Sequence, residues 1–409
     1  MTIGSLQAHP VKITGLFALT ACIYFLTIDQ QRISGVLYGF YNSTKCQSED
    51  YLSKRVIVTG TNRLNLSTYG DLYTHVYKVL GYRLRQPSKS ECHNLEWHNV
   101  SLLPLKEQSR QSCDSVFGDW VSIASNYSVP ARAPKQPSLN AKQRNEYTLL
   151  GSVRMTDWYI NGIQQQKVPG RVIWSNKTWS TSYFNGMSEA LTKNSVGSCG
   201  NSNRYEQCFT YGDSGNVWHA LRRVGVRGAR VGVIGTQVPW VEAIALHLGA
   251  REVITFEYNQ VRIEHPAVRV LHPIDAAQNW RSVEPFDHIV SFSSLEHSGL
   301  GRYGDPLGPF DDLVELRKAH CWLKPGGTLT VGVPVGPDQV SFNAHRQYGA
   351  IRMPLMFAIG YELIHFYAEV NDRDRLNELM SKVTAGRGRQ PVMVMKKTHW
   401  KQLDDTLVK

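Results

Sequence analysis

The most constraining feature of this 409-residue chain is the alternation of short apolar strands with helical segments after residue 210. Strands and helices that alternate at this spacing are typical of βαβ units, which build a mainly parallel sheet covered by helices on both faces. The sequence therefore predicts an α/β fold for the second half of the chain. The expected strands are 229–234, 252–256, 268–271, 288–292, 328–333, 361–367 and 391–395, and the expected helices are 238–248, 311–323 and 374–383.

The expected domain organisation follows from this change of pattern. Residues 29–140 contain two short strand-like runs, 55–59 and 75–80, and a proline-rich basic stretch at 129–137 that is typical of a linker or stem. Residues 141–210 are rich in Asn, Ser and Gly but carry scattered Trp and Tyr, so their fold stays unassigned. The predicted segments are a short cytoplasmic tail (1–12), a transmembrane signal anchor (13–28), a lumenal stem or accessory region (29–140), a second accessory region (141–210), the α/β domain (211–398) and a C-terminal tail (399–409).

The signal anchor is predicted from an uncharged, mostly apolar run of 16 residues that Lys12 and Asp29 enclose. A membrane-spanning helix takes about 20 apolar residues, and the apolar part of a signal peptide takes about 7–15. Because no small-x-small cleavage site follows the run, the sequence favours a retained anchor over a cleaved signal peptide. We therefore expect a single-pass membrane protein of the secretory pathway, in the Golgi, with its C-terminal domain in the lumen.

Acceptor triplets for N-glycosylation agree with a lumenal first half. All five triplets of the form N-x-[ST] lie before residue 185, and coincidence in a Ser/Thr-rich segment is the alternative explanation. They begin at Asn42, Asn65, Asn99, Asn126 and Asn176. Glycans at these sites would suit an exposed stem, so we expect a glycoprotein.

The cysteines allow disulfides but indicate no metal site. Besides Cys22 in the apolar run, six cysteines form an even set that allows 15 pairings, and the pair expected to join locally is Cys199 with Cys208. No C-x-x-C or H-x-x-x-H spacing occurs, so we expect no zinc site. The other four cysteines are Cys46, Cys92, Cys113 and Cys321.

The net charge of +11 would by itself suggest a nucleic-acid-binding protein. The excess is uneven, however, since residues 1–210 carry +9 and residues 211–409 carry +2. No zinc-finger, RNP or basic-helix motif accompanies it, so we expect no nucleic-acid partner and consider acidic glycans or membrane surfaces better partners for the basic half. Hydrophobic residues at 42% and charged residues at 19% exclude a largely disordered chain.

Three residues at predicted strand ends suggest a nucleoside site. Gly235 ends the first strand, where the chain turns into a helix whose N-terminus can face a ligand. Glu257 closes the second strand, at the distance along the chain where a carboxylate accepts hydrogen bonds from ribose hydroxyls. Asp275 follows the third strand, where a carboxylate could reach an adenine amino group. Each of these residues alone could be a solvated charge or a turn residue. The prediction of a nucleoside site therefore rests on their order along the chain.

The segments that follow resemble a known enzyme family. Residues 286–297 (FDHIVSFSSLEH) look like the fourth-strand motif of class I S-adenosylmethionine-dependent methyltransferases, and 323–327 (LKPGG) resembles their turn into the fifth strand. Residues 360–367 and 392–397 look like their closing antiparallel hairpin. The resemblance covers about residues 211–398 and implies a Rossmann-like methyltransferase sheet. The whole chain also resembles a nematode-expanded, Caenorhabditis-type family of membrane proteins, which by itself implies no activity.

The resemblance implies roles for individual residues. Gly235 would approach the methionine part of S-adenosylmethionine, Glu257 the ribose and Asp275 the adenine, while Ser293, Ser294 and His297 would face cofactor and acceptor. The family's glycine loop usually has three glycines at alternating positions, whereas here Gln237 and Pro239 occupy the second and third.

Transfer of a methyl group to a hydroxyl also needs a general base. His297 is the first candidate, because an ordinary histidine titrates near neutrality, and Asp305 and His345 are the alternatives. The polar residues 341–348 could bind a sugar or carboxylate, or could instead form a capped loop before a helix.

The leading functional prediction is a lumenal methyltransferase that acts on a hydroxyl of a glycan or another secreted acceptor. The acceptor is inferred from the compartment and not from any residue. One alternative is a non-catalytic, membrane-anchored binding module with an altered cofactor loop. Another is a glycosyltransferase, since residues 372–374 (DRD) form a D-x-D that could hold a metal and a nucleotide diphosphate, although ordinary surface charge explains that motif better.

Overall fold

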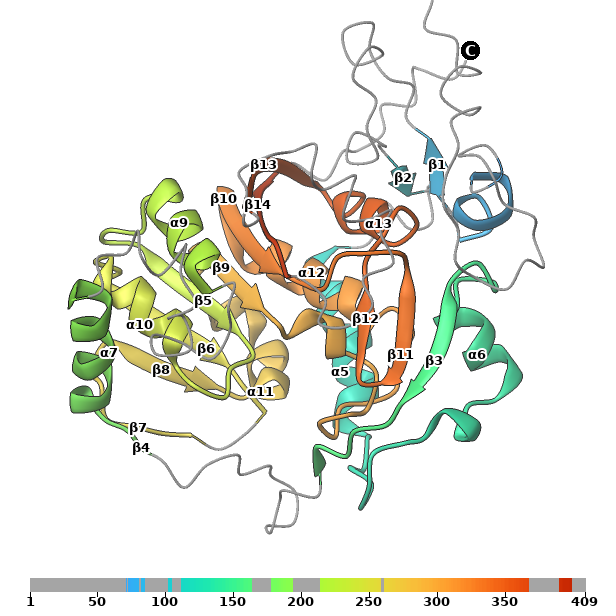
Figure 1. Ribbon diagram of the computed structural model, residues 1–409, viewed down its shortest axis with the longest axis horizontal. Coiled ribbons are helices and arrows are strands. Elements are labelled where there is room, and N and C mark those ends of the chain that lie inside the picture. The colour runs from blue at the N-terminus through green and yellow to red at the C-terminus, as the bar shows by residue number, and fades with distance from the viewer. Residues whose placement is uncertain are drawn as a thin grey trace, which may run out of the picture.

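The computed structural model describes residues 71, 73–80, 82–84, 102–104, 112–163, 178–193, 214–258, 261–367 and 390–398. Its centre is a seven-stranded sheet with the order β13-β14-β10-β9-β5-β6-β8 (Figure 1). The strands are β5 (Arg230–Ile234), β6 (Glu252–Phe256), β8 (Val268–Leu271), β9 (Phe286–Phe292), β10 (Leu323–Gly332), β13 (Tyr361–Tyr367) and β14 (Val392–Lys397).

The strand directions confirm the predicted sheet. Neighbours from β8 to β10 are parallel, and β14 is antiparallel to both β10 and β13. All five residues of β5 are buried, as expected for a central parallel strand that is covered on both faces. This is the mainly parallel sheet with an antiparallel closing hairpin that the resemblance implies.

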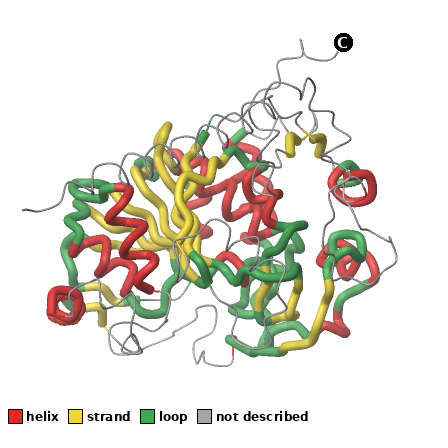
Figure 2. Tube along the Cα trace, turned by 45° about the horizontal axis from the view of Figure 1, so that its top comes forward, coloured by secondary structure: helices red, strands yellow, loops and turns green. Residues whose placement is uncertain are grey.

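Helices cover both faces of the sheet (Figure 2). On one face a hydrophobic core forms with α7 (Thr181–Lys193), α9 (Ser214–Val224) and α10 (Trp240–His247). On the other face a larger core includes α5 (Cys113–Ser125), α11 (Pro273–Gln278), α12 (Asp311–Trp322) and α13 (Met353–Phe357). The predicted helices 238–248 and 311–323 correspond to α10 and α12, and the predicted helix 374–383 lies outside the described residues.

The first half of the chain contributes to the larger core, so the core does not divide at residue 210. Phe117 and Trp120 of α5 and Tyr147 of α6 (Ala141–Tyr147) are buried in the same cluster as Phe256 and Trp322. Phe117 packs against Trp322 with ring centroids 4.8 Å apart. Residues before 210 are therefore structural parts of the domain that begins after them.

A second, three-stranded sheet corrects the prediction for the polar residues 341–348. They form a β-hairpin of β11 (Gln339–Asn343) and β12 (His345–Gln347), and β3 (Arg154–Trp158) pairs in parallel with β11. The segment is therefore not a capped loop before a helix, because its main chain is paired in this sheet, and Asn343 and Arg346 are buried.

The predicted strand-like run 75–80 is also wrong. Tyr73–Tyr77 form a turn of π-helix, η2, and Val76 and Tyr77 both pack into the larger core. Adjacent residues of a strand point to opposite faces, so a strand would have separated these two side chains. The remaining short elements are β1 (Tyr82–Leu84), β2 (Leu102–Pro104), η5 (Gln136–Ser138), β4 (Thr178–Trp179), β7 (Arg262–Ile263), η8 (Trp280–Ser282) and η9 (Leu295–His297).

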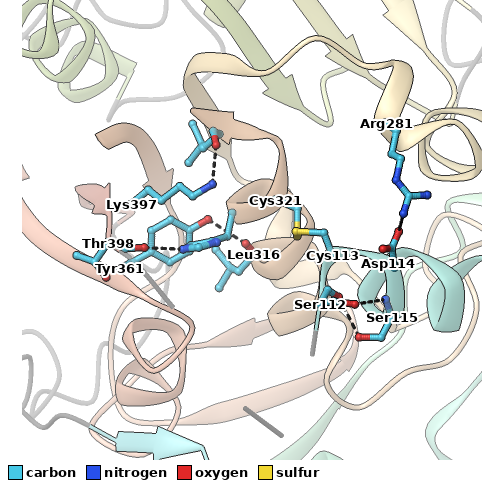
Figure 3. The surroundings of a disulfide bond; sticks show 12 residues. Ser112, Cys113, Asp114, Ser115, Arg281, Leu316, Cys321, Tyr361, Lys397 and Thr398 are labelled. Atoms are coloured by element: carbon cyan, nitrogen blue, oxygen red, sulfur yellow. Dashed lines mark hydrogen bonds and ion pairs between the residues drawn. A yellow bond between two sulfur atoms is a disulfide. The ribbon is translucent and has the colours of Figure 1, made fainter. Parts of the chain in front are cut away.

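A disulfide joins Cys113 at the start of α5 to Cys321 near the end of α12 (Figure 3). The two cysteines are 208 residues apart in the sequence. On the side of α12 away from α5, the Tyr361 hydroxyl donates to the Leu316 carbonyl at 2.9 Å. The disulfide and this hydrogen bond fix α12 between α5 and the closing hairpin. The predicted pair Cys199 and Cys208 lies outside the described residues.

Several predictions concern residues that the structure does not describe. The predicted anchor 13–28, both predicted tails and the D-x-D at 372–374 fall outside the described ranges. No helix within those ranges is long and apolar enough to cross a membrane. Of the five predicted glycosylation acceptors, Asn126 is described, and it is exposed at the end of α5.

Candidate functional site

A cleft opens at the carboxyl ends of β5, β6 and β9, where ligands bind to open α/β sheets. It contains about 1250 Å³ of empty space, part of which is open to solvent. Six of the eight site residues predicted from the sequence line it, and they are Gly235, Glu257, Ser293, Ser294, His297 and Asp305. Asp275 and His345 are not among its lining residues.

Gly235 makes the turn that follows β5, and no larger residue fits there. Its φ is +69°, and a Cβ at this position would lie 2.0 Å from the Ser294 Oγ. The ends of β5 and β9 therefore approach each other closely at the cleft. Gln237 lines the cleft but is exposed, and Pro239 is buried at the N-cap of α10.

Replacement of Gly235 by alanine tests this close approach. Gly235→Ala is expected to lower the free energy of unfolding by about 2–3 kcal/mol, because it adds a steric clash to the cost of a positive φ. Gly326→Ala is the matched control, since Gly326 has a φ of +74° but no atom within 4 Å of an added Cβ. It is expected to cost about 1 kcal/mol. Equal losses in urea unfolding of the two variants would contradict the close approach.

Glu257 is held at the edge of the cleft by the main chain of the neighbouring turn. The side chain is buried, and its Oε2 accepts a hydrogen bond from the Thr236 amide at 2.9 Å. Behind it, the buried carboxyl of Glu242 on α10 accepts a hydrogen bond from the Thr255 hydroxyl at 2.8 Å. Burial, and to a smaller extent the charge of Glu257, raise the pKa of Glu242 to about 7. At neutral pH, Glu242 is therefore partly protonated, and the negative charge near Glu257 is smaller.

Ser293 and Ser294 follow β9 in an unusual backbone conformation. Ser293 has a φ of +52°, which non-glycine residues seldom adopt and which is concentrated at functional sites. Its Oγ accepts a hydrogen bond from the Gln390 amide at 3.1 Å, and its own amide donates to the Gly332 carbonyl at 2.9 Å. These contacts keep the chain at the end of β9 turned toward the cleft.

His297 has a defined tautomer. Its Nδ1 lies 2.6 Å from the Ala344 carbonyl oxygen, and because a carbonyl can only accept, Nδ1 must carry the proton. The Nε2 atom of the neutral ring then carries the lone pair, and it lies 3.7 Å from Oε1 of the buried Glu296. The pKa of His297 is held well below its usual value, mainly by burial and to a smaller extent by the positive charge of Arg302. The ring is therefore neutral at pH 7.

Asp305 and His345, the alternative bases, have other contacts. The Asp305 carboxylate accepts hydrogen bonds from the amides of Gly301 (3.1 Å) and Tyr303 (3.2 Å), and burial raises its pKa. Its contacts fix the loop that follows η9. His345 packs edge to face on Trp158, and burial lowers its pKa to about 4. Asp275 is exposed in the first turn of α11.

A group of residues on the wall of the cleft formed by α5 and α12 was not predicted from the sequence. Lys318 is buried there, with its Nζ 2.5 Å from Glu315 and 3.4 Å from the centre of the Trp120 ring. The missed lining residues include Trp120, Tyr258, Tyr303, Asp311, Glu315, Lys318 and Trp322. Tyr258 directly follows Glu257 and could have been recognised from that position. No sequence signal connects Trp120 with the cleft. In the described part of the chain, no three His, Cys, Asp or Glu side chains are placed to hold a metal ion.

The solved structures that resemble this one include methyltransferases of low sequence identity. The Burkholderia thailandensis 1,6-didemethyltoxoflavin-N1-methyltransferase, with bound 1,6-didemethyltoxoflavin and S-adenosylhomocysteine, has 15% identity and a TM-score of 0.33, over 55% of this chain and 92% of the other. An S-adenosylmethionine-dependent methyltransferase from Mesorhizobium loti has 14% identity and a TM-score of 0.30, over 44% of this chain and 98% of the other. Similarities this distant do not assign an activity to this chain.

No curated protein matches the chain significantly in sequence. Residues 228–398, which contain β5 to β14 and most of the cleft, match a family described as "Caenorhabditis protein of unknown function, DUF268".

Proposed function

We propose that the cleft binds S-adenosylmethionine and that the protein transfers its methyl group to a hydroxyl of a glycan or another secretory-pathway acceptor. The observation that carries this proposal is the convergence of Gly235, Glu257 and Ser293 on one cleft. These residues come from three strand ends of a sheet with the strand order described above. The acceptor class is taken from the predicted compartment.

The residues present fit the proposed cofactor. The missing Cβ at Gly235 lets the main chain approach a ligand, and the carboxylate of Glu257 can accept hydrogen bonds from ribose hydroxyls in addition to the Thr236 amide. Gln237, which replaces a glycine of the family pattern, is exposed and does not fill the cleft. When bound, the cofactor would supply a methyl group carried on a sulfonium sulfur, and this sulfur would be the leaving group of an in-line displacement.

His297 is the proposed general base. During methyl transfer, Nε2 of His297, which lies 3.7 Å from Glu296 Oε1, would accept the proton of the acceptor hydroxyl. The Nδ1–H remains bonded to the Ala344 carbonyl throughout, which holds the ring in place. The nearby charge of Arg302 disfavours the imidazolium, so the ring returns its proton readily to solvent.

Isothermal titration of the full-length chain with S-adenosylhomocysteine tests the cofactor assignment. Glu257→Ala is expected to weaken binding by at least about tenfold, because a hydrogen bond to a charged group contributes roughly 1.5–3 kcal/mol. The control is Glu264→Ala, which removes an exposed carboxylate that pairs with Arg262 outside the cleft. Binding that survives Glu257→Ala unchanged would contradict the ribose contact.

A lumenal location and a membrane anchor are part of the proposal. The disulfide between Cys113 and Cys321 supports an oxidising compartment, and the exposed Asn126 supports glycosylation. Endoglycosidase treatment should increase gel mobility, and the protein should pellet with membranes after alkaline carbonate extraction. An unchanged band would argue against the lumenal location, and release into the supernatant would favour a cleaved signal peptide.

A non-catalytic binding module is the second candidate. It is favoured by Gln237 and Pro239, which stand where the family has glycines and leave the first helical turn without one amide donor. Under this alternative, the folded full-length chain would bind neither S-adenosylmethionine nor S-adenosylhomocysteine.

A further inference from the structure

The charges that line the cleft are unevenly balanced. Among the described residues, four carboxylates and one lysine, Lys318, line it. Three of the carboxylates have partners among the described residues. Glu257 accepts from a main-chain amide, Asp305 accepts from two, and Glu315 pairs with Lys318. The fourth, Asp311, therefore decides which charge the cleft prefers in a ligand.

Within the described ranges, no hydrogen bond or ion pair joins the Asp311 carboxylate to another residue. The carboxylate is nonetheless held in place, because an added Cβ at Gly308 would lie 2.0 Å from its Oδ1 and one at Gly299 would lie 2.7 Å from its Cβ. Asp311 therefore fills the space that two glycines of the preceding loop leave open. Its side chain lines the cleft from the first turn of α12.

The surroundings of Asp311 disfavour its charged form. The pKa of Asp311 is raised to about 7, chiefly by burial; the charge of Arg346 acts against this rise, the carboxylates Glu315 and Asp305 add to it, and Lys318 acts against it. A group in this state gains most from a positive charge placed beside it. Since no three acidic or histidine side chains of the described residues are arranged to hold a metal ion, an organic cation fits this place better.

Aromatic rings on the same wall suit an organic cation. Lys318 places its ammonium group 3.4 Å from the centre of the Trp120 ring, so one aromatic ring of this wall already pairs with a cation. The Tyr258 ring lines the cleft as well, and Glu315, Asp305 and Asp311 are close enough to raise the pKa of its hydroxyl after burial has done so. A carboxylate beside aromatic faces is a common way of binding ammonium and guanidinium groups.

We propose that the methyl acceptor carries a positive charge, an ammonium or guanidinium group, which pairs with Asp311 beside Tyr258. This inference rests on the proposed function, because it assigns this wall of the cleft to the acceptor of the methyl group. It narrows the acceptor from hydroxyl compounds in general to those that carry a cation. It also excludes acidic glycans as acceptors, although the basic first half of the chain could still attract them.

Three probes of nearly the same shape and different charge test the inference: benzylamine, benzyl alcohol and benzoate. Each is titrated calorimetrically into the full-length chain at pH 8, with and without saturating S-adenosylhomocysteine. We expect benzylammonium to bind at least about tenfold more tightly than benzyl alcohol, because one charge-assisted hydrogen bond contributes about that much to affinity. Benzoate is expected to bind more weakly than both. Asp311→Asn should abolish the preference for benzylammonium, whereas Asp119→Asn, on an exposed position of α5, should retain it.

The outcomes separate this inference from the proposed function. Equal affinities of the wild-type chain for the three probes, or a preference for benzoate, would overturn the inference, and this comparison needs no variant to fold. A preference for benzylammonium that persists in Asp311→Asn would also overturn it. Failure of S-adenosylhomocysteine to bind would overturn the proposed function, while the response to the three probes would still show whether the cleft selects a cation.

Discussion

Replacing both Cys113 and Cys321 by serine is expected to lower the free energy of unfolding by about 4–5 kcal/mol. The disulfide closes a loop of 208 residues, and the entropy that a cross-link removes from the unfolded chain grows with the length of the loop. It also joins α5 to α12, which together form the wall of the cleft that contains Trp120 and Lys318. Urea unfolding of the oxidised wild type and of the double variant measures the difference.

The reductant response of the two proteins is the control for this experiment. Reduction should lower the stability of the wild type by most of the same amount, whereas the double variant should lose much less. Single replacements at either cysteine should match the double variant, because each removes the same cross-link. A double variant as stable as the oxidised wild type would show that packing of α5 on α12, and not the disulfide, fixes this wall.

The central sheet could be predicted from the sequence because each of its strands is a local signal. The expected ranges 252–256, 268–271 and 361–367 agree with β6, β8 and β13 at both ends. The central strands β5 and β6 are buried at nearly every position, so their pattern does not depend on knowledge of a partner. Gly235 and Glu257 could be found for the same reason, since they mark the ends of such strands.

The wall of the cleft could not be predicted, because its residues meet through long-range packing. Trp120 and Lys318 are about two hundred positions apart in the chain and lie on helices whose contact the sequence does not indicate. Asp311 begins a helix, where an acidic residue is expected in any case from the helix dipole, so its position carried no signal of its own. Asp275 is the opposite case: its position along the chain predicted a site residue, but its side chain is exposed and does not line the cleft.

The buried ion pair of Asp312 and Arg352 leads to the second large effect. The Asp312 carboxylate accepts from Arg352 Nε at 2.8 Å and Nη2 at 2.6 Å, and from the Tyr348 hydroxyl at 2.9 Å. Burial alone would raise the pKa of Asp312, but the charges of Arg352 and Arg346 and these hydrogen bonds hold it below its usual value. Asp312→Ala leaves two buried guanidinium groups without this carboxylate, and we expect a loss of about 3–5 kcal/mol in the free energy of unfolding.

This pair also connects the core to the cleft. Arg346 donates to the Gly308 carbonyl at 3.1 Å and Arg352 donates to the Pro309 carbonyl at 2.7 Å, so both arginines hold the loop that precedes Asp311. Amide hydrogen exchange at residues 298–309 should therefore become faster in Asp312→Ala, and Asp312→Asn should lie between this variant and the wild type. Asp119→Ala removes an exposed carboxylate from α5 and should change stability by less than about 0.5 kcal/mol. If Asp312→Ala were as stable as that control, the arginines would need no counter-charge, and the loop at the cleft would have to be held by its own main-chain hydrogen bonds.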